Sequence, residues 1–204
     1  MTMPLVDNKV VIRPAASGDF EWVANIMVRA LSPFYDGDHY AHAKRIFDTH
    51  MEGGIDYVGH FSAGQFMFIA ELGGERVGII HVVEKKQKTV KISPLIVSPD
   101  YRGKLGIGSM LLEHAENFAR SIGARQLYCT VASPNQKALE FFLRKGFRIT
   151  GTAKDHYKQG IDEHMLYKDP SDEPGYESPN VSVVPFDQEN HADGVRRLII
   201  TQMS

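Results

Sequence analysis

Three closely spaced glycines, Gly103, Gly106 and Gly108, stand between an apolar run and a strongly amphipathic segment. The N-terminus of a helix presents unpaired main-chain amides and the positive end of the helix dipole, and glycine lets a phosphate approach without meeting a Cβ atom. Arg102 and Lys104 add positive charge beside the glycines. The spacing predicts a phosphate-binding loop, although turns and helix starts also use glycine routinely.

The surrounding sequence excludes two common phosphate loops. No Gly-Lys-Ser/Thr follows at the spacing of a P-loop, and a dinucleotide-binding loop would follow the first strand of a parallel unit. This loop instead follows the fourth predicted strand of the chain. Another kind of phosphate site is therefore expected.

The elements that position the loop alternate in an order typical of an α+β domain. Hydrophobic patterns predict strands over 10–12, 66–72, 76–83, 89–97, 126–132, 147–151 and 164–168. Helices are predicted up to Leu31 with Ser17 or Asp19 as the cap, over 39–51, from the glycines to Gly123, and from Pro134 to Lys145. Short turns make the second to fourth strands antiparallel, and Pro94 predicts a β-bulge. The expected fold is a central, mostly antiparallel mixed sheet flanked by helices.

The composition excludes several classes of protein. A net charge of -2 and a pI near 6.5 give no reason to expect nucleic acid as a partner. Cys129 is the only cysteine, which rules out a disulfide within the chain and fits a reducing compartment. Neither a signal peptide nor an apolar run long enough to span a membrane is recognisable. A soluble, cytoplasmic protein is expected.

The chain is expected to contain one domain and a short extension. We predict a domain over 9–168, a linker over 169–180 that is rich in proline and acidic residues, and a strand and helix over 181–204. This last segment resembles the opening strand and helix of the domain, so half of a tandem protein is an alternative. Its apolar positions must be buried somewhere, which favours a homodimer.

Two segments resemble the signatures of the GNAT superfamily of acyl-CoA-dependent N-acyltransferases. Residues 95–109 with Leu111-Leu112 resemble its acetyl-CoA motif, and Asn135 with the segment 138–147 resembles its second signature. The resemblance covers about residues 10–168 and implies a GNAT-like fold. It implies that strand 95–97 pairs with the pantetheine arm and that amides from Lys104 to Ser109 hold the pyrophosphate. The implied cofactor-binding residues are Leu95, Ile96, Val97, Arg102, Gly103, Lys104, Leu105, Gly106, Ile107, Gly108, Ser109 and Asn135.

The sequence departs from the family's pattern at the loop and at the catalytic positions. One residue is inserted after Arg102, and Lys91, Thr130 and Phe142 occupy the places of the usual glutamates and tyrosine. His81 and Tyr128 are the leading replacements, although a strand histidine or tyrosine is more often structural. The other candidates are Glu84, Thr130 and His164. Catalysis mainly by positioning is an alternative.

The segment between the first two helices has the side chains to recognise an amine. Phe34, Tyr35, Asp36 and Asp38 combine aromatic faces with carboxylates suited to an ammonium group. His39 and His42 have no third ligand at convincing spacing, so no metal is expected. We predict transfer of an acetyl group from acetyl-CoA to an amine of a small molecule or to an exposed amino group. The alternative is a non-catalytic acyl-CoA sensor.

Overall fold

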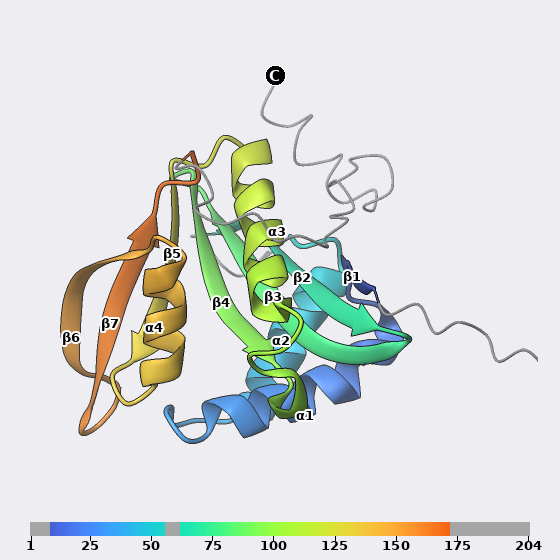
Figure 1. Cartoon of the computed structure of the whole chain (residues 1–204), viewed down its shortest axis with the longest axis horizontal. Helices are drawn as coiled ribbons and strands as arrows, with labels where there is room; N and C mark the ends of the chain where they lie inside the picture. Colours follow the sequence, from blue (N-terminus) through green and yellow to red (C-terminus); the bar gives the residue numbers. More distant parts are fainter. Residues whose placement is uncertain (1–8, 56–61, 172–204) are drawn as a thin grey trace, which may run out of the picture.

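The computed structural model describes residues 9–55 and 62–171, which form a seven-stranded sheet with helices on both faces (Figure 1). The strand order is β1-β2-β3-β4-β5-β7-β6, and only the β4–β5 pair is parallel. The strands are β1 (Val10–Pro14), β2 (Ser62–Leu72), β3 (Glu75–Lys85), β4 (Thr89–Val97), β5 (Gln126–Ala132), β6 (Arg148–Lys158) and β7 (Ile161–Lys168). The helices are α1 (Phe20–Leu31), α2 (His39–Met51), α3 (Ile107–Ser121) and α4 (Gln136–Arg144), with 3-10 turns η1 (Ser17–Asp19) and η2 (Pro99–Tyr101). The predicted α+β fold is confirmed.

Two apolar cores lie on opposite faces of the sheet. On one face α3 packs over the central strands, burying Leu111 and Phe118 against Phe66 and other strand residues. On the other face α1 and α2 bury Met27 and Ile46 against strand residues that include Ile69, Ile79 and Ile96. Figure 1 shows α3 and α4 in front of the sheet and α1 and α2 behind it. In Figure 1 α1 and α2 lie behind β1 to β4 rather than behind β5, β7 and β6, where the loop between α1 and α2 contacts β6 and β7.

A β-bulge divides β4 at the predicted place. Ser93 and Pro94 stand opposite the single residue His81, because β3 pairs Ile80 with Leu95 and Val82 with Ile92. The extra residue reverses which side chains of β4 face α3, since the two faces of a strand alternate. The parallel pairing with β5 ends before the bulge, at Lys91. Beyond Lys91, β4 and β5 separate and leave a wedge between them.

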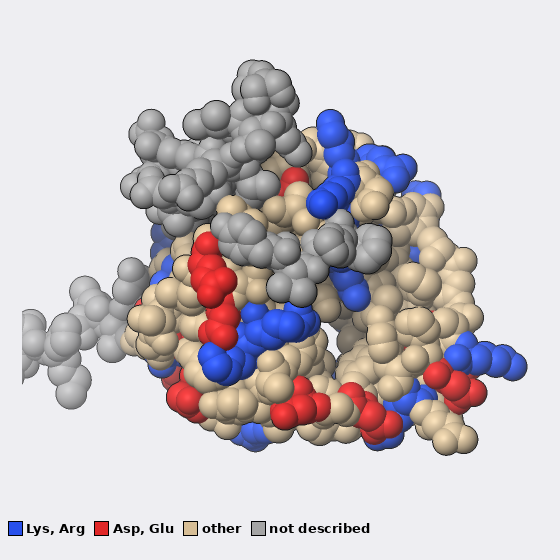
Figure 2. Space-filling view, turned by 180° about the vertical axis from the view of Figure 1, so that it is seen from behind, with Lys and Arg blue, Asp and Glu red and all other residues tan. Residues whose placement is uncertain are grey.

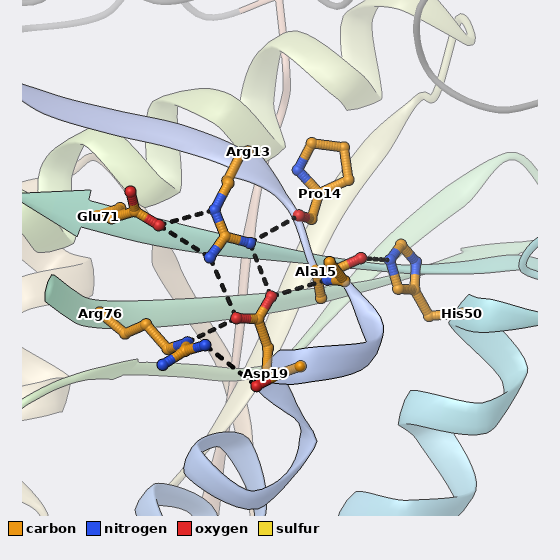
Figure 3. Close-up of polar contacts among 9 residues, drawn as sticks. Arg13, Pro14, Ala15, Asp19, His50, Glu71 and Arg76 are labelled. Carbon is orange, nitrogen blue, oxygen red and sulfur yellow. Dashed lines mark hydrogen bonds and ion pairs between the residues drawn. The ribbon is translucent and has the colours of Figure 1, made fainter. Parts of the chain in front are cut away.

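Asp19 is the N-cap residue of α1, as one expectation from the sequence has it, but its side chain makes no capping hydrogen bond to the helix. Its buried carboxylate accepts hydrogen bonds from Arg13 at 2.7 Å, from the Ala16 amide at 2.7 Å and from Arg76 (Figure 3). Burial alone would raise the pKa of Asp19, but these donors together hold it well below its usual range. Arg13 also pairs with Glu71 at 2.8 Å, so this network joins β1, the start of α1 and the β2–β3 hairpin.

Two further expectations concern the start of α4 and the C-terminal segment. Pro134 lies outside α4, because the cap is Asn135, whose side chain accepts the Ala138 amide at 3.4 Å. The described chain ends at Ser171, where Arg120 still donates to the Pro170 carbonyl at 2.9 Å. The rest of the predicted linker and the strand and helix over 181–204 lie outside the described residues. Within the part that is described, no helix has the length and apolar character to cross a membrane.

Candidate functional site

A cleft of about 2760 Å³ opens where β4 and β5 separate. Its walls come from β4, β5, the glycine-rich loop, the first turns of α3 and α4, and the loop between α1 and α2. Figure 2 shows the face that carries α1 and α2, with an opening near the centre of the view and Lys and Arg atoms beside it. The cleft therefore runs from the glycine-rich loop to the loop between α1 and α2.

The glycine-rich loop turns sharply so that its amides collect at the start of α3. Gly103, Leu105 and Gly106 adopt left-handed backbone angles, with φ values of 72°, 54° and 65°. Gly106 is the N-cap of α3, and its carbonyl accepts the Met110 amide at 3.0 Å. Among the described residues, the amides of 105–109 donate to no main-chain acceptor. A helix N-terminus of this kind favours an anion.

Two residues of the loop make contacts that the predicted phosphate site did not include. The Lys104 amide donates to the Tyr101 carbonyl at 3.1 Å, so it is already used within the loop. The Arg102 guanidinium donates from Nε to the Val97 carbonyl at 3.0 Å. Both side chains still line the cleft. The available amides therefore begin at Leu105 rather than at Lys104.

The last residues of β4 offer main-chain groups to the wedge. The Ile96 carbonyl faces β3, since a Cβ built on Gly78 would lie 3.1 Å from it. Main-chain groups of neighbouring strand residues point to opposite edges, so those of Leu95 and Val97 point toward the wedge. Asn135 lines the other side of the cleft from the start of α4. The sequence alone did not show that the main-chain groups of Ile96 point toward β3 while those of Leu95 and Val97 point toward the wedge.

His81 lies in the cleft wall with one ring nitrogen unused. It is 1% exposed, and Nδ1 lies 2.6 Å from the Ser93 carbonyl at the bulge. A carbonyl only accepts, so Nδ1 carries the proton and Nε2 is an acceptor. Nε2 is buried and has no hydrogen-bond partner among the described residues. Burial lowers the pKa of His81 to about 3, so the ring is neutral near pH 7.

The other candidate catalytic side chains are dispersed. Tyr128 is half-buried between Lys91 and Tyr167 in the sheet and is not among the residues that line the cleft. His164 pairs with the Thr152 hydroxyl at 2.9 Å, also away from the cleft. Three positions that the family usually uses do line the cleft: Lys91, Thr130 and Phe142. Glu84 and Cys129 also have structural surroundings, Glu84 beside a surface turn and Cys129 in the core under α3.

The loop between α1 and α2 contacts the β6–β7 hairpin at one end of the cleft. Tyr35 and Phe34 line the cleft, and Asp36 pairs with Lys158 of β6 at 3.3 Å. Asp38 lies outside the cleft lining, and its carboxylate caps α2 by accepting the Ala41 amide at 2.9 Å. The predicted acceptor residues thus separate into three that face the cleft and one that shapes α2.

Two residues at this end of the cleft were not predicted. The Tyr35 hydroxyl donates to Glu163 of β7 at 3.0 Å, and Glu163 is 1% exposed. Burial, followed by the charge of Glu163, raises the pKa of Tyr35. The Tyr157 ring packs edge-on against Tyr35 at 5.8 Å between centroids and lines the cleft. Burial also raises the pKa of Tyr157, so both phenols stay protonated near pH 7.

The described residues contain no group of three or more histidine, cysteine or acidic side chains arranged to hold a metal ion. The cleft lining offers main-chain amides, imidazoles, phenols, carboxylates and several cations.

Comparison with known proteins identifies the class to which this fold and cleft belong. The model of the acetyltransferase (GNAT) family matches residues 27–147, more than half of the chain. The chain belongs to the GNAT acetyltransferase family. In structure, it resembles a GNAT-family acetyltransferase from Desulfovibrio desulfuricans, with a TM-score of 0.67 and 19% identity over 79% of this chain and 99% of that one. It also resembles spermidine N-acetyltransferase from Vibrio cholerae in complex with CoA and spermine, with a TM-score of 0.63 and 16% identity over 80% and 96%.

The relatives that are similar in sequence match a shorter segment. Streptothricin acetyltransferase from Streptomyces lavendulae is 38% identical over 78 residues, which cover 37% of this chain and 41% of that protein. N-alpha-acetyltransferase 50 from Danio rerio is 34% identical over 87 residues, covering 41% and 51%. The chain thus spans at most about half the length of these relatives. Their names refer to acceptors of different kinds.

Proposed function

We propose that this protein transfers an acetyl group from acetyl-CoA to an amine of a small molecule or to an exposed amino group. The observation that carries the proposal is the wedge between β4 and β5, which opens at Lys91 and ends at the unused amides of 105–109. An extended pantetheine arm needs a free strand edge, and a pyrophosphate needs a helix N-terminus. The wedge supplies both in one cleft.

The residues of the cleft fit acetyl-CoA at each part of its length. In our proposal the main chain of Leu95 and the amide of Val97 pair with the pantetheine arm, and Asn135 contacts it from the opposite wall. The amides of 105–109 bind the pyrophosphate, with Arg102 and Lys104 adding positive charge. Acetyl-CoA, when bound, supplies an acetyl group activated as a thioester.

The proton chemistry is assigned to side chains that line the cleft. As the amine attacks the thioester carbon and the carbon–sulfur bond breaks, the nitrogen loses a proton and the departing CoA thiolate gains one. In our proposal a water molecule carries this proton, and the buried Nε2 of neutral His81 orients that water by accepting a hydrogen bond from it. Tyr35 and Tyr157 hold the acceptor in position with their rings and hydroxyls. Tyr128 has no part in this assignment because it does not line the cleft.

An amine panel tests the function. Purified protein with acetyl-CoA and separate primary amines, including amino acids, polyamines, aminoglycosides and short peptides, is expected to release free thiol only when a suitable amine is present. Mass spectrometry should then find that amine acetylated. Tight acetyl-CoA binding with no acetylated product from any amine would instead favour the non-catalytic sensor.

A further inference from the structure

The acceptor half of the cleft carries an excess of positive charge. Arg29 of α1, Arg45 of α2 and Lys91 of β4 line it, together with His42. The only acidic residue in the cleft lining on this side is Asp36, among the residues that the structure describes, and Lys158 already pairs with it. A cation such as a polyamine would meet like charges along this wall.

The basic residues come together from two elements. His42 and Arg45 are three residues apart on α2 and therefore share a helix face. Lys91 precedes the bulge on β4, opposite Val83, and so faces the same side of the sheet as His81. Burial lowers the pKa of His42 first, and the charges of Arg45, His39 and Lys91 lower it further. These charges are thus near enough to act on one imidazole.

Among these basic residues, Lys91 gives the strongest evidence for an anion-binding site. It is half-buried, and neither it nor Arg45 has an ion-pair or side-chain hydrogen-bond partner within the described residues. Burial lowers the pKa of Lys91, while the charge of Glu163 acts the other way. Lys168, by contrast, pairs with Glu116 at 2.8 Å. A half-buried ammonium without a partner gains most from an added anion.

The opposite wall of the same space has different chemistry. Glu163 lies behind Tyr35 on β7, and the rings of Tyr35 and Tyr157 face the cleft. Aromatic faces backed by a carboxylate suit an ammonium group. The two walls therefore complement the two ends of a molecule that carries both charges.

We propose that the wall formed by His42, Arg45 and Lys91 binds an anionic group of the acceptor, so that the preferred acceptor is an amine that also carries a carboxylate, as an amino acid does. This inference rests on the proposed function, because it names the substrate class of the same cleft. The carboxylate binds Arg45 and Lys91, and the amine lies toward Tyr35 and Tyr157. A phosphate on the acceptor shares the same chemistry and forms a separate arm of the test.

Matched amines test the proposal. Values of kcat/KM are compared for glycine and glycinamide, for β-alanine and β-alaninamide, and for methionine and methioninamide, each at the same concentration of unprotonated amine. Phosphoethanolamine and spermidine form the phosphate and polycation arms. The acid of at least one pair is expected to exceed its amide by about tenfold. Spermidine or the amides as the best acceptors would overturn the proposal.

Variants separate this wall from a general loss of activity. Lys91→Met and Arg45→Gln each remove one charge, and Lys44→Gln is the control, since Lys44 lies on the same helix and pairs with Asp48 on the surface. The first two should raise KM for the acid about tenfold while leaving KM for the amide within about twofold. Equal effects on acid and amide would overturn the assignment.

Binding without turnover distinguishes failure of this inference from failure of the proposed function. N-acetylglycine and N-acetylglycinamide contain no reactive amine, and calorimetry measures their binding to the CoA-loaded protein. Tighter binding of the acid, lost in Lys91→Met, supports the anionic subsite even if no amine is acetylated. Equal binding of the two probes overturns it, whatever the amine panel shows.

Discussion

The Tyr35 hydroxyl donates a hydrogen bond to Glu163 at 3.0 Å, although the two residues are 128 positions apart in the sequence. Tyr35 belongs to the loop between α1 and α2, and Glu163 belongs to β7, so this bond closes one end of the cleft. The Asp36–Lys158 pair joins the same two segments. Together these contacts fix the loop that faces the acceptor.

The first prediction concerns this bond. Tyr35→Phe leaves the buried Glu163 without its donor and should lower the free energy of unfolding by about 1–3 kcal/mol, since an unsatisfied buried polar group carries that cost. Urea unfolding measures the change. The matched variant Phe34→Leu keeps the bond and should cost less. If Tyr35→Phe is as stable as the wild type, the bond does not hold the loop.

The second prediction concerns the glycine-rich loop. A Cβ added at Gly108 would lie 3.4 Å from the Phe141 ring and 3.6 Å from Val97, so Gly108→Val should crowd the mouth of the wedge. We expect CoA affinity, measured by calorimetry, to fall by about tenfold or more with the fold retained. Gly151→Val is the control, because nothing lies within 4 Å of its added Cβ. Unchanged CoA affinity in Gly108→Val would place the cofactor elsewhere.

The third prediction concerns His81. In our proposal His81→Gln removes the neutral imidazole whose Nε2 accepts a hydrogen bond from the proton-carrying water, so kcat should fall by about a hundredfold. CoA affinity should stay the same because the substitution lies away from the loop. His164→Gln, which lies outside the cleft, should leave kcat unchanged. A wild-type kcat in His81→Gln would show that catalysis rests on positioning or on another base.

The fourth prediction concerns Asp19 and pH. Its pKa in the folded protein lies below the unfolded value of about 3.9, so its contribution to stability is present above about pH 4 and is lost as the pH falls below that value. Asp19→Asn should lower the free energy of unfolding by about 3 kcal/mol at neutral pH, because Arg13 and Arg76 lose their buried partner. The loss should shrink at about pH 3, where urea unfolding is repeated. An equal loss at both pH values would contradict this account.

The fifth prediction concerns the C-terminal residues, which lie outside the described structure. Deleting residues 176–204 should convert a homodimer into a monomer if the apolar positions of this segment are buried in a subunit interface. Light scattering coupled to size-exclusion chromatography measures the mass. A truncated protein with the same oligomeric state and stability would show that the segment forms no interface.

Local signals predicted much of the fold. Turn residues and alternating apolar positions placed β4 and β5 at their observed ends, and helical spacing did so for α2. Pro94 predicted the bulge, because proline cannot donate a main-chain hydrogen bond within a β-ladder. The exposed strand β6 extends to Lys158, well beyond the prediction at Gly151, because its polar residues give no alternating pattern.

The site was predicted less completely because its parts meet through tertiary contacts. The glycine-rich loop carries its signal in consecutive residues, so the sequence located it. The partnership of Glu163 with Tyr35 depends on how β7 lies beside β5, which no local pattern specifies. Asp38 has the right chemistry for an amine, but its carboxylate caps α2. The sequence identified candidate side chains, but it did not show which way each of them points in the folded protein.

The most direct test of the central proposal is the stoichiometry of acetyl transfer. Purified protein is mixed with acetyl-CoA and its best amine, and free thiol and acetylated amine are measured together over time. We predict one acetylated amine for each thiol released, at a rate that depends on the amine and falls in Gly108→Val. Bound acetyl-CoA that is never consumed, or thiol released without acetylated amine, would contradict the proposal that this cleft is an N-acetyltransferase site.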